Sequence, residues 1–208
     1  HGHHRRQRQM CIRDRSSLIL DEYHPYEDLP KMINPTSGYI FNTNNSPFNS
    51  TAEFENLKEE DYNSTFSFME EENNRSIRFM ELIDDYEKLS YEDFKKIKYD
   101  QQYPDSILYI GNISQIFDLD KSEFPDYENL IDLIQKWDRR GDIENIGAAQ
   151  WSLYYSYMLD VLSENDLNVK DTIDIKFHLD ALEKTKDRLM KNFGKLDIRL
   201  GDIQRLVR

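Results

Sequence analysis

Apolar residues recur at helical spacing through most of the chain beyond residue 74. The clearest case is residues 126–138, where apolar side chains stand at i, i+3, i+4, i+7 and i+10, namely Tyr127, Leu130, Ile131, Ile134 and Trp137. This spacing predicts an amphipathic helix with one buried face. Arg139-Arg140-Gly141 supplies cations and a glycine at the expected C-terminal end of that helix.

Four further stretches predict helices. Residues 75–86 carry a buried stripe that includes Ile77, Met80 and Ile83, and Ser90 begins the next helix with a pattern like a capping box. Residues 146–163 are apolar on more than one face, so we expect that helix at the centre of the core. The longest helix is predicted over 172–193, with Gly194 ending it.

The chain before residue 75 has a different pattern. Pro25, Pro30 and Pro35 disfavour helix, whereas the short apolar run 39–41 between turn signals favours a strand, so one or two strands are expected before residue 45. Residues 49–74 predict a long surface loop. Alternation in Leu196, Ile198 and Leu200 suggests a return to strand over 194–208. The predicted fold class is mainly α with a few β-strands.

Composition indicates a globular protein and excludes several functions. The 208 residues are 38% hydrophobic and 12% aromatic, enough for one sizeable core. A net charge of -13 and a pI near 4.8 disfavour non-specific binding to nucleic acid or to an anionic membrane, because phosphate contacts need clustered cations. The mean hydropathy is -0.82, and no apolar run is long enough to predict a transmembrane span.

Residues 1–15 differ from the rest of the chain. They hold five Arg against one Asp, three of the five His, and the single cysteine, Cys11. Residues 9–15 resemble translated sequencing-adapter text, so we interpret 1–15 as a non-native leader and 16–208 as the protein proper; the alternative is a basic disordered arm. Without Cys11 the chain offers no disulfide, and the redox compartment cannot be read from it.

One run of residues, 34–48, carries the most specific chemistry. It surrounds the short apolar segment with turn formers and amide side chains, among them Asn42, Asn44 and Asn45. An amide held at the end of a strand can donate an N–H to a developing oxyanion. The simpler alternative is that Asn44 only caps a turn of the strand.

Several motifs, in order, resemble the penicillin acylase family, in the branch with acyl-homoserine lactone and aculeacin acylases. They are Leu29-Pro30, Asn34-Pro35-x-Ser37-Gly38-Tyr39, Asn42-x-Asn44-x-Ser46-Pro47-Phe48, Arg75, Leu89-Ser90-x-x-Asp93-Phe94 with Asp100, Trp137-Asp138, Gly147-Ala148-Ala149, and Phe193-Gly194-x-Leu196-Asp197-Ile198-x-x-Gly201-Asp202-Ile203-Gln204-Arg205. The resemblance implies an N-terminal nucleophile hydrolase with an αββα sandwich fold.

The resemblance also implies roles for individual residues. Asn44 would be the oxyanion amide, Asn42 and Asn45 would brace it through backbone hydrogen bonds, and Arg75 would orient the catalytic amide or the substrate. The alternative for Arg75 is an ion pair with Glu70, Glu71 or Glu72. His24 and His178 are not expected to act as bases.

The family's nucleophilic Ser lies far upstream of the Asn motif, at the start of the catalytic subunit, and Ser16 and Ser17 lack the residues that flank it in the family. We therefore expect this chain to be an inactive internal piece of the catalytic β subunit. Its partners would be the α subunit and the rest of the β subunit, and its substrate a small-molecule acyl amide such as a β-lactam, an acyl-homoserine lactone or a lipopeptide. The resemblance implies a periplasmic or secreted enzyme that requires no cofactor; calcium occurs in parts of the family, but no ligand can be mapped here. The rival interpretation is a non-catalytic, acidic helical scaffold or binding module.

Overall fold

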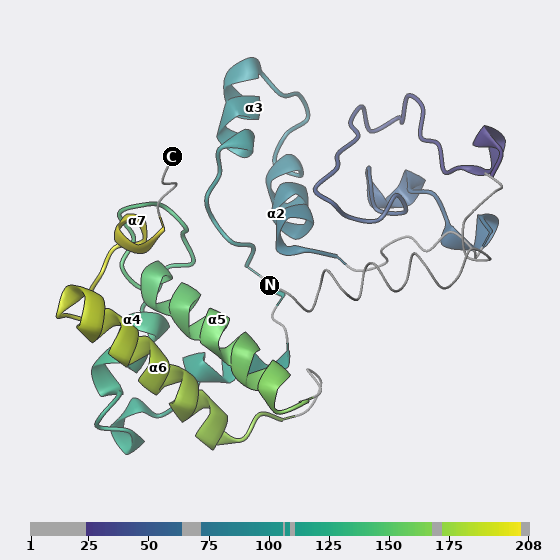
Figure 1. The fold of residues 1–208 in the computed structure, drawn as a ribbon. Coiled ribbons are helices and arrows are strands. Elements are labelled where there is room, and N and C mark those ends of the chain that lie inside the picture. Colours follow the sequence, from purple (N-terminus) through teal and green to yellow (C-terminus); the bar gives the residue numbers. More distant parts are fainter. Residues whose placement is uncertain (1–23, 64–71, 106, 109–110, 168–171, 205–208) are drawn as a thin grey trace, which may run out of the picture. The chain divides into compact units, whose positions relative to one another are not determined.

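The structure is a computed structural model that describes residues 24–63, 72–105, 107–108, 111–167 and 172–204 (Figure 1). The chain divides into two compact units, residues 1–71 and residues 72–208. The stretch interpreted as a leader, 1–15, and the carboxylates of Glu70 and Glu71 lie outside the described residues.

The described part of the first unit, residues 24–63, is built from irregular chain and three single turns of 3₁₀ helix. These turns are η2 (Tyr26–Asp28), η3 (Glu53–Glu55) and η4 (Glu59–Asp61). The strand expected at Tyr39–Phe41 was a wrong prediction, since no strand is found within 24–63. A β-ladder needs a facing strand. Here the Phe41 N–H donates to the Ser50 carbonyl at 2.9 Å, and within residues 24–63 no second backbone hydrogen bond continues this pairing as a ladder.

The second unit is helical, as the periodicity predicted. Its α-helices are α2 (Asn74–Ile83), α3 (Tyr91–Lys98), α4 (Glu128–Gln135), α5 (Ala148–Glu164), α6 (Ile175–Phe193) and α7 (Leu200–Ile203). Two 3₁₀ segments, η5 (Gly111–Phe117) and η6 (Lys121–Glu123), precede α4. All five helices expected from the sequence are confirmed as α2 to α6, and the expectation of a mainly α chain holds for the described residues.

Helix ends follow capping chemistry. The Ser90 side chain accepts the Asp93 N–H at the start of α3, and Asp174 accepts the Lys176 N–H at the start of α6. Gly194 ends α6 in the left-handed conformation, φ 69°. The predicted end of α4 was too late, because the helix stops at Gln135 and not near Gly141.

The core of this unit lies between α4, α5, α6 and η5, and Figure 1 shows α5 and α6 side by side. Residues Ile113, Ile116, Leu130, Ile131, Ile134, Tyr154, Met158, Val161, Ala181, Leu182 and Leu189 have no exposed surface. Trp137 lies beyond the end of α4 but is still buried, and it stacks on Trp151 with ring centroids 5.7 Å apart. The multi-faced apolar pattern of 146–163 therefore reflects a central helix.

The C-terminal segment forms a helical turn in place of the predicted strand. Ile198 is buried, Arg199 forms an isolated bridge with Ile146, and the chain then turns into α7. The Leu200 and Gly201 N–H groups donate to the carbonyls of Asn145 and Ile143 at 2.9 and 2.8 Å. These bonds pull the backbone into a turn, so the alternating pattern does not extend into a ladder. Over the described ranges, no helix combines the length and apolarity needed to cross a membrane.

Candidate functional site

The loop that carries Asn44 is held by its own side chains. Asn44 has φ 66°, in the left-handed region that non-glycine residues seldom adopt. Its backbone N–H donates to Asn42 Oδ1 at 2.8 Å, an Asx-type turn that favours this conformation. The Asn44 residue is exposed, whereas Phe41 and Ser46 on either side are buried. The sequence therefore places a surface amide on a backbone fixed at both ends.

Asn45 fastens the same turn from the other side. Its Oδ1 accepts the Thr43 N–H at 2.7 Å and the Thr43 hydroxyl at 3.0 Å, and its Nδ2 donates to the carbonyls of Ser46 and Asn49. The carboxamides of Asn42 and Asn45 thus form hydrogen bonds with backbone groups of residues 43–49. Such contacts restrict the conformations open to the loop and fix the direction of the backbone at Thr43 and Asn44, the two residues between them.

A second polar cluster lies before this turn. The Glu55 carboxylate accepts the Thr36 N–H and hydroxyl, both at 2.7 Å, and the Ser37 N–H at 2.8 Å. Desolvation raises the pKa of Glu55, but the hydrogen bonds from Ser37 and Thr36 outweigh it and lower that pKa to about 2. Nothing in the sequence pattern singled out Glu55, because its partners are 18 and 19 residues away in an aperiodic loop.

Arg75 belongs to the other unit, so Asn44 and Arg75 are each described within their own part of the structure. Arg75 is exposed in the first turn of α2, where its N–H donates to the capping side chain of Asn73 at 3.0 Å. The Glu72 carboxylate, one of the proposed ion-pair partners, accepts the Ser76 hydroxyl at 2.6 Å. The local fold explains why Arg75 begins a helix, and its catalytic role stays a prediction.

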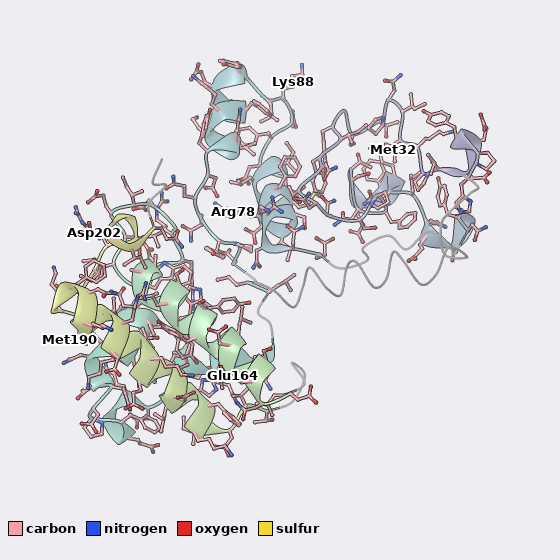
Figure 2. All side chains as sticks on the ribbon, viewed as in Figure 1. Met32, Arg78, Lys88, Glu164, Met190 and Asp202 are labelled. Carbon is pink, nitrogen blue, oxygen red and sulfur yellow. The ribbon has the colours of Figure 1, made fainter. Side chains whose placement is uncertain are left out.

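Arg78, which Figure 2 labels on α2 and which the sequence analysis did not single out, forms ion pairs with Glu81 and Asp100. Its Nε and Nη2 donate to the two oxygens of Asp100 at 2.8 and 3.3 Å, and its Nη1 donates to Glu81 at 3.1 Å. The hydrogen bond to Asp100 is the main cause that raises the pKa of Arg78. Asp100 was part of the family pattern, and here it joins α2 to the segment after α3.

His178 lies in the core and not at a surface site. The Tyr154 hydroxyl is 2.5 Å from His178 Nδ1, and His178 Nε2 is 3.1 Å from Gln115 Oε1. Burial lowers the pKa of His178 to about 4 and raises the pKa of Tyr154 above its ordinary value. Tyr154 of α5 is fully buried, in line with the central core helix expected over 146–163.

The family motifs of the C-terminal unit contact one another. A Cβ added to Gly147, φ 98°, would lie 2.9 Å from the Trp137 Cβ, so glycine is required where α5 begins. Asp138 accepts the Asn145 side-chain N–H at 2.7 Å, and Gln150 Nε2 donates to the Ile198 carbonyl at 3.2 Å. These motifs therefore connect the start of α5 to the segment after α6.

The described residues contain no cluster of the side chains that most often bind metal ions. No three His, Cys, Asp or Glu side chains there gather closely enough to hold an ion. Calcium, considered from the family resemblance, is therefore not assigned to any described residue.

Comparison with known proteins defines the class of the chain. The sequence matches the family model described as penicillin amidase over residues 4–206. This match identifies a hydrolase of the group that acts on the carbon–nitrogen bonds of amides. The chain belongs to the penicillin amidase family. No solved structure was found to match it.

Proposed function

We propose that this chain supplies the oxyanion amide, Asn44, to an N-terminal nucleophile amidohydrolase of the acyl-homoserine lactone and aculeacin acylase-like branch. In the proposed reaction a serine hydroxyl attacks the carbonyl of a linear, non-peptide amide, and its own α-amino group takes the proton. Asn44 Nδ2–H donates to the oxygen that becomes negatively charged. The α-amino group then passes its proton to the leaving nitrogen, so that the C–N bond breaks and the free amine departs, while the acyl chain stays on the serine until water releases it as a carboxylic acid.

The observation that carries this proposal is the conformation of Asn44. Backbone held in a sparsely populated φ/ψ region is concentrated at active sites, because only a surrounding structure that fixes it can maintain it. Here Asn42 and Asn45 provide that surrounding structure, and the exposed position of Asn44 leaves its amide at the surface of the described unit. A preorganised donor stabilises charge without reorganising during the reaction.

Family membership favours this amidohydrolase over the alternative of a non-catalytic helical scaffold. We further propose that the nucleophile comes from the remaining β subunit of the precursor, with the α subunit completing the acyl site. This chain alone is then inactive. The substrate is an acyl amide of a β-lactam, an acyl-homoserine lactone or a lipopeptide, and the enzyme works in the periplasm or outside the cell without a required cofactor.

The test uses the acylase assembled from this chain and the serine-bearing segment, with a chromogenic acyl anilide as substrate. Asn44→Ala should lower kcat by about 100- to 1,000-fold, the usual cost of losing one oxyanion donor. Asn44→Gly should lose as much activity, although glycine accepts the φ of 66° without strain.

Asn34→Gly is the matched control, because Asn34 is also an exposed, left-handed asparagine, φ 51°, in the same unit. It should keep the wild-type kcat. Wild-type turnover by the Asn44→Gly enzyme would refute the oxyanion role.

A further inference from the structure

The loop over residues 49–63 reaches back to the chain just before the Asn44 turn. Glu55, in η3, receives three hydrogen bonds from Thr36 and Ser37, each between 2.7 and 2.8 Å. A carboxylate that accepts several short hydrogen bonds holds its donors firmly, because charge-assisted bonds are shorter and stronger than neutral ones.

Thr51 extends this cluster to the apolar segment. Its side chain has no exposed surface, and its hydroxyl lies 2.8 Å from the Tyr39 carbonyl and 3.3 Å from Glu55 Oε1. Both of those oxygens only accept, and the single Thr51 proton is donated to the nearer one, the Tyr39 carbonyl, so the Ser37 hydroxyl, 2.8 Å away, donates to Thr51. Because Glu55 also accepts the Ser37 N–H, it acts on Tyr39 through Ser37 and Thr51.

Asn56 completes the connection. Its Oδ1 accepts the N–H groups of Ser50 and Thr51 at 2.9 and 3.1 Å, and the Ser50 carbonyl accepts the Phe41 N–H at 2.9 Å. The backbone is thus tied at Tyr39 and at Phe41, immediately before the turn that presents Asn44. A shift at Glu55 would displace the start of that turn.

We infer that Glu55 is a positioning residue for Asn44, which it holds in place through Ser37, Thr51 and the segment Tyr39–Phe41. This inference rests on the proposed function. The inference also explains the long loop after residue 48. The turn that carries Asn44 has no carboxylate of its own, and η3 supplies that of Glu55. The Thr36 N–H, the Thr36 hydroxyl and the Ser37 N–H all donate to Glu55, so both of its oxygens must accept, as those of an unprotonated carboxylate do.

The experiment measures kcat and KM for the assembled acylase with substitutions at Glu55. Glu55→Gln places an N–H₂ group against donors, and it should lower kcat about 10- to 100-fold with KM unchanged, since a misplacement of about 1 Å costs on the order of 100-fold. Glu55→Asp keeps the charge on a shorter side chain and should give an intermediate kcat. Glu53→Gln is the matched control: it removes the same charge from the same 3₁₀ turn, and should leave kcat unchanged.

A double substitution separates positioning of Asn44 from a general loss of structure. If Glu55 acts through Asn44, adding Glu55→Gln to Asn44→Ala should lower kcat no further. Wild-type kcat in Glu55→Gln, or the same additional loss in the Asn44→Ala background, would overturn the inference while the proposed function stands. Wild-type kcat in Asn44→Ala would overturn the proposed function itself. Should Glu55→Gln fail to fold, Glu55→Asp is judged by the same criteria.

Discussion

The buried imidazole of His178 makes the stability of the helical unit depend on pH in a way that can be worked out from its contacts. His178 has 1% of its surface exposed. Gln115 Oε1 can only accept, so His178 Nε2 carries the proton and Nδ1 is left to accept from the Tyr154 hydroxyl. The folded state therefore contains the neutral imidazole, and a second proton would have to enter between Nδ1 and Tyr154.

The magnitude follows from the difference between the two states. Burial lowers the pKa of His178 from 6.5 to about 4, and each pKa unit corresponds to about 1.4 kcal/mol. The unfolded chain binds the proton below pH 6.5 while the folded chain does not, so the free energy of unfolding falls with decreasing pH. About 3 kcal/mol of stability, fully present above pH 6.5, should be lost by pH 4.

The assay is urea unfolding between pH 4 and 8, followed by tryptophan fluorescence. Both tryptophans, Trp137 and Trp151, lie in the core of the unit that contains His178, so the signal reports that unit. His178→Gln removes the titrating group. The difference in unfolding free energy between wild type and this variant should change by up to about 1.4 kcal/mol per pH unit between pH 4 and 6.5, because contributions shared by both proteins cancel.

His24→Gln is the control, since His24 is exposed in the other unit. It should track the wild type at every pH. A difference profile for His178→Gln that stays flat from pH 4 to 6.5, or that slopes the other way, would refute the assignment of a buried neutral imidazole.

Two further predictions concern the stability of the same unit. Gly147→Ala should lower the free energy of unfolding in urea by about 2–4 kcal/mol, because φ is 98° and the new Cβ would lie 2.9 Å from the Trp137 Cβ. Gly194→Ala should lower it by only about 1–2 kcal/mol, because φ is 69° there but no atom lies near the new Cβ. Equal losses in the two variants would contradict the packing argument. Arg78→Met should lower the free energy of unfolding by about 1 kcal/mol, because it removes the ion pair with Asp100. This loss should be smaller in about 1 M salt, because the pair is partly exposed and salt screens it. A loss that does not change with salt would contradict an electrostatic origin.

Local signals were sufficient for the helices. The apolar stripe of 126–138, the serine at position 90 and the glycine at position 194 each act within a few residues of themselves, so α3, α4 and α6 could be predicted from neighbouring positions alone. The end of α4 was predicted too late because Trp137 continues the apolar spacing, although it is buried by packing against Trp151 after the helix has ended. Periodicity reports burial, and burial does not require the helix to continue.

Strands were predicted less well, for a physical reason. A strand forms only where a second strand pairs with it, and the sequence of a short apolar run such as Tyr39–Phe41 does not show whether such a partner exists. In the described residues this segment is tied by the Thr51 hydroxyl and the Ser50 carbonyl, contacts made across 9 to 12 residues of aperiodic loop. The Glu55 cluster was missed for the same reason, since an acidic residue in a loop has the same sequence signal whether it faces water or hydroxyl and N–H groups of Thr36, Ser37 and Thr51.

By itself, the sequence determined the helical class of the C-terminal unit, the acidic charge that disfavours nucleic acid and anionic membranes, and the motifs of an amide-hydrolysing family. Tertiary structure alone decided that Asn44 has a left-handed backbone held by its neighbours, that His178 is neutral in the core, and that Glu55 holds the chain ahead of the amide. Helix propensity and capping act between residues three or four positions apart, whereas hydrogen-bond geometry and desolvation depend on which distant groups the folded chain brings together.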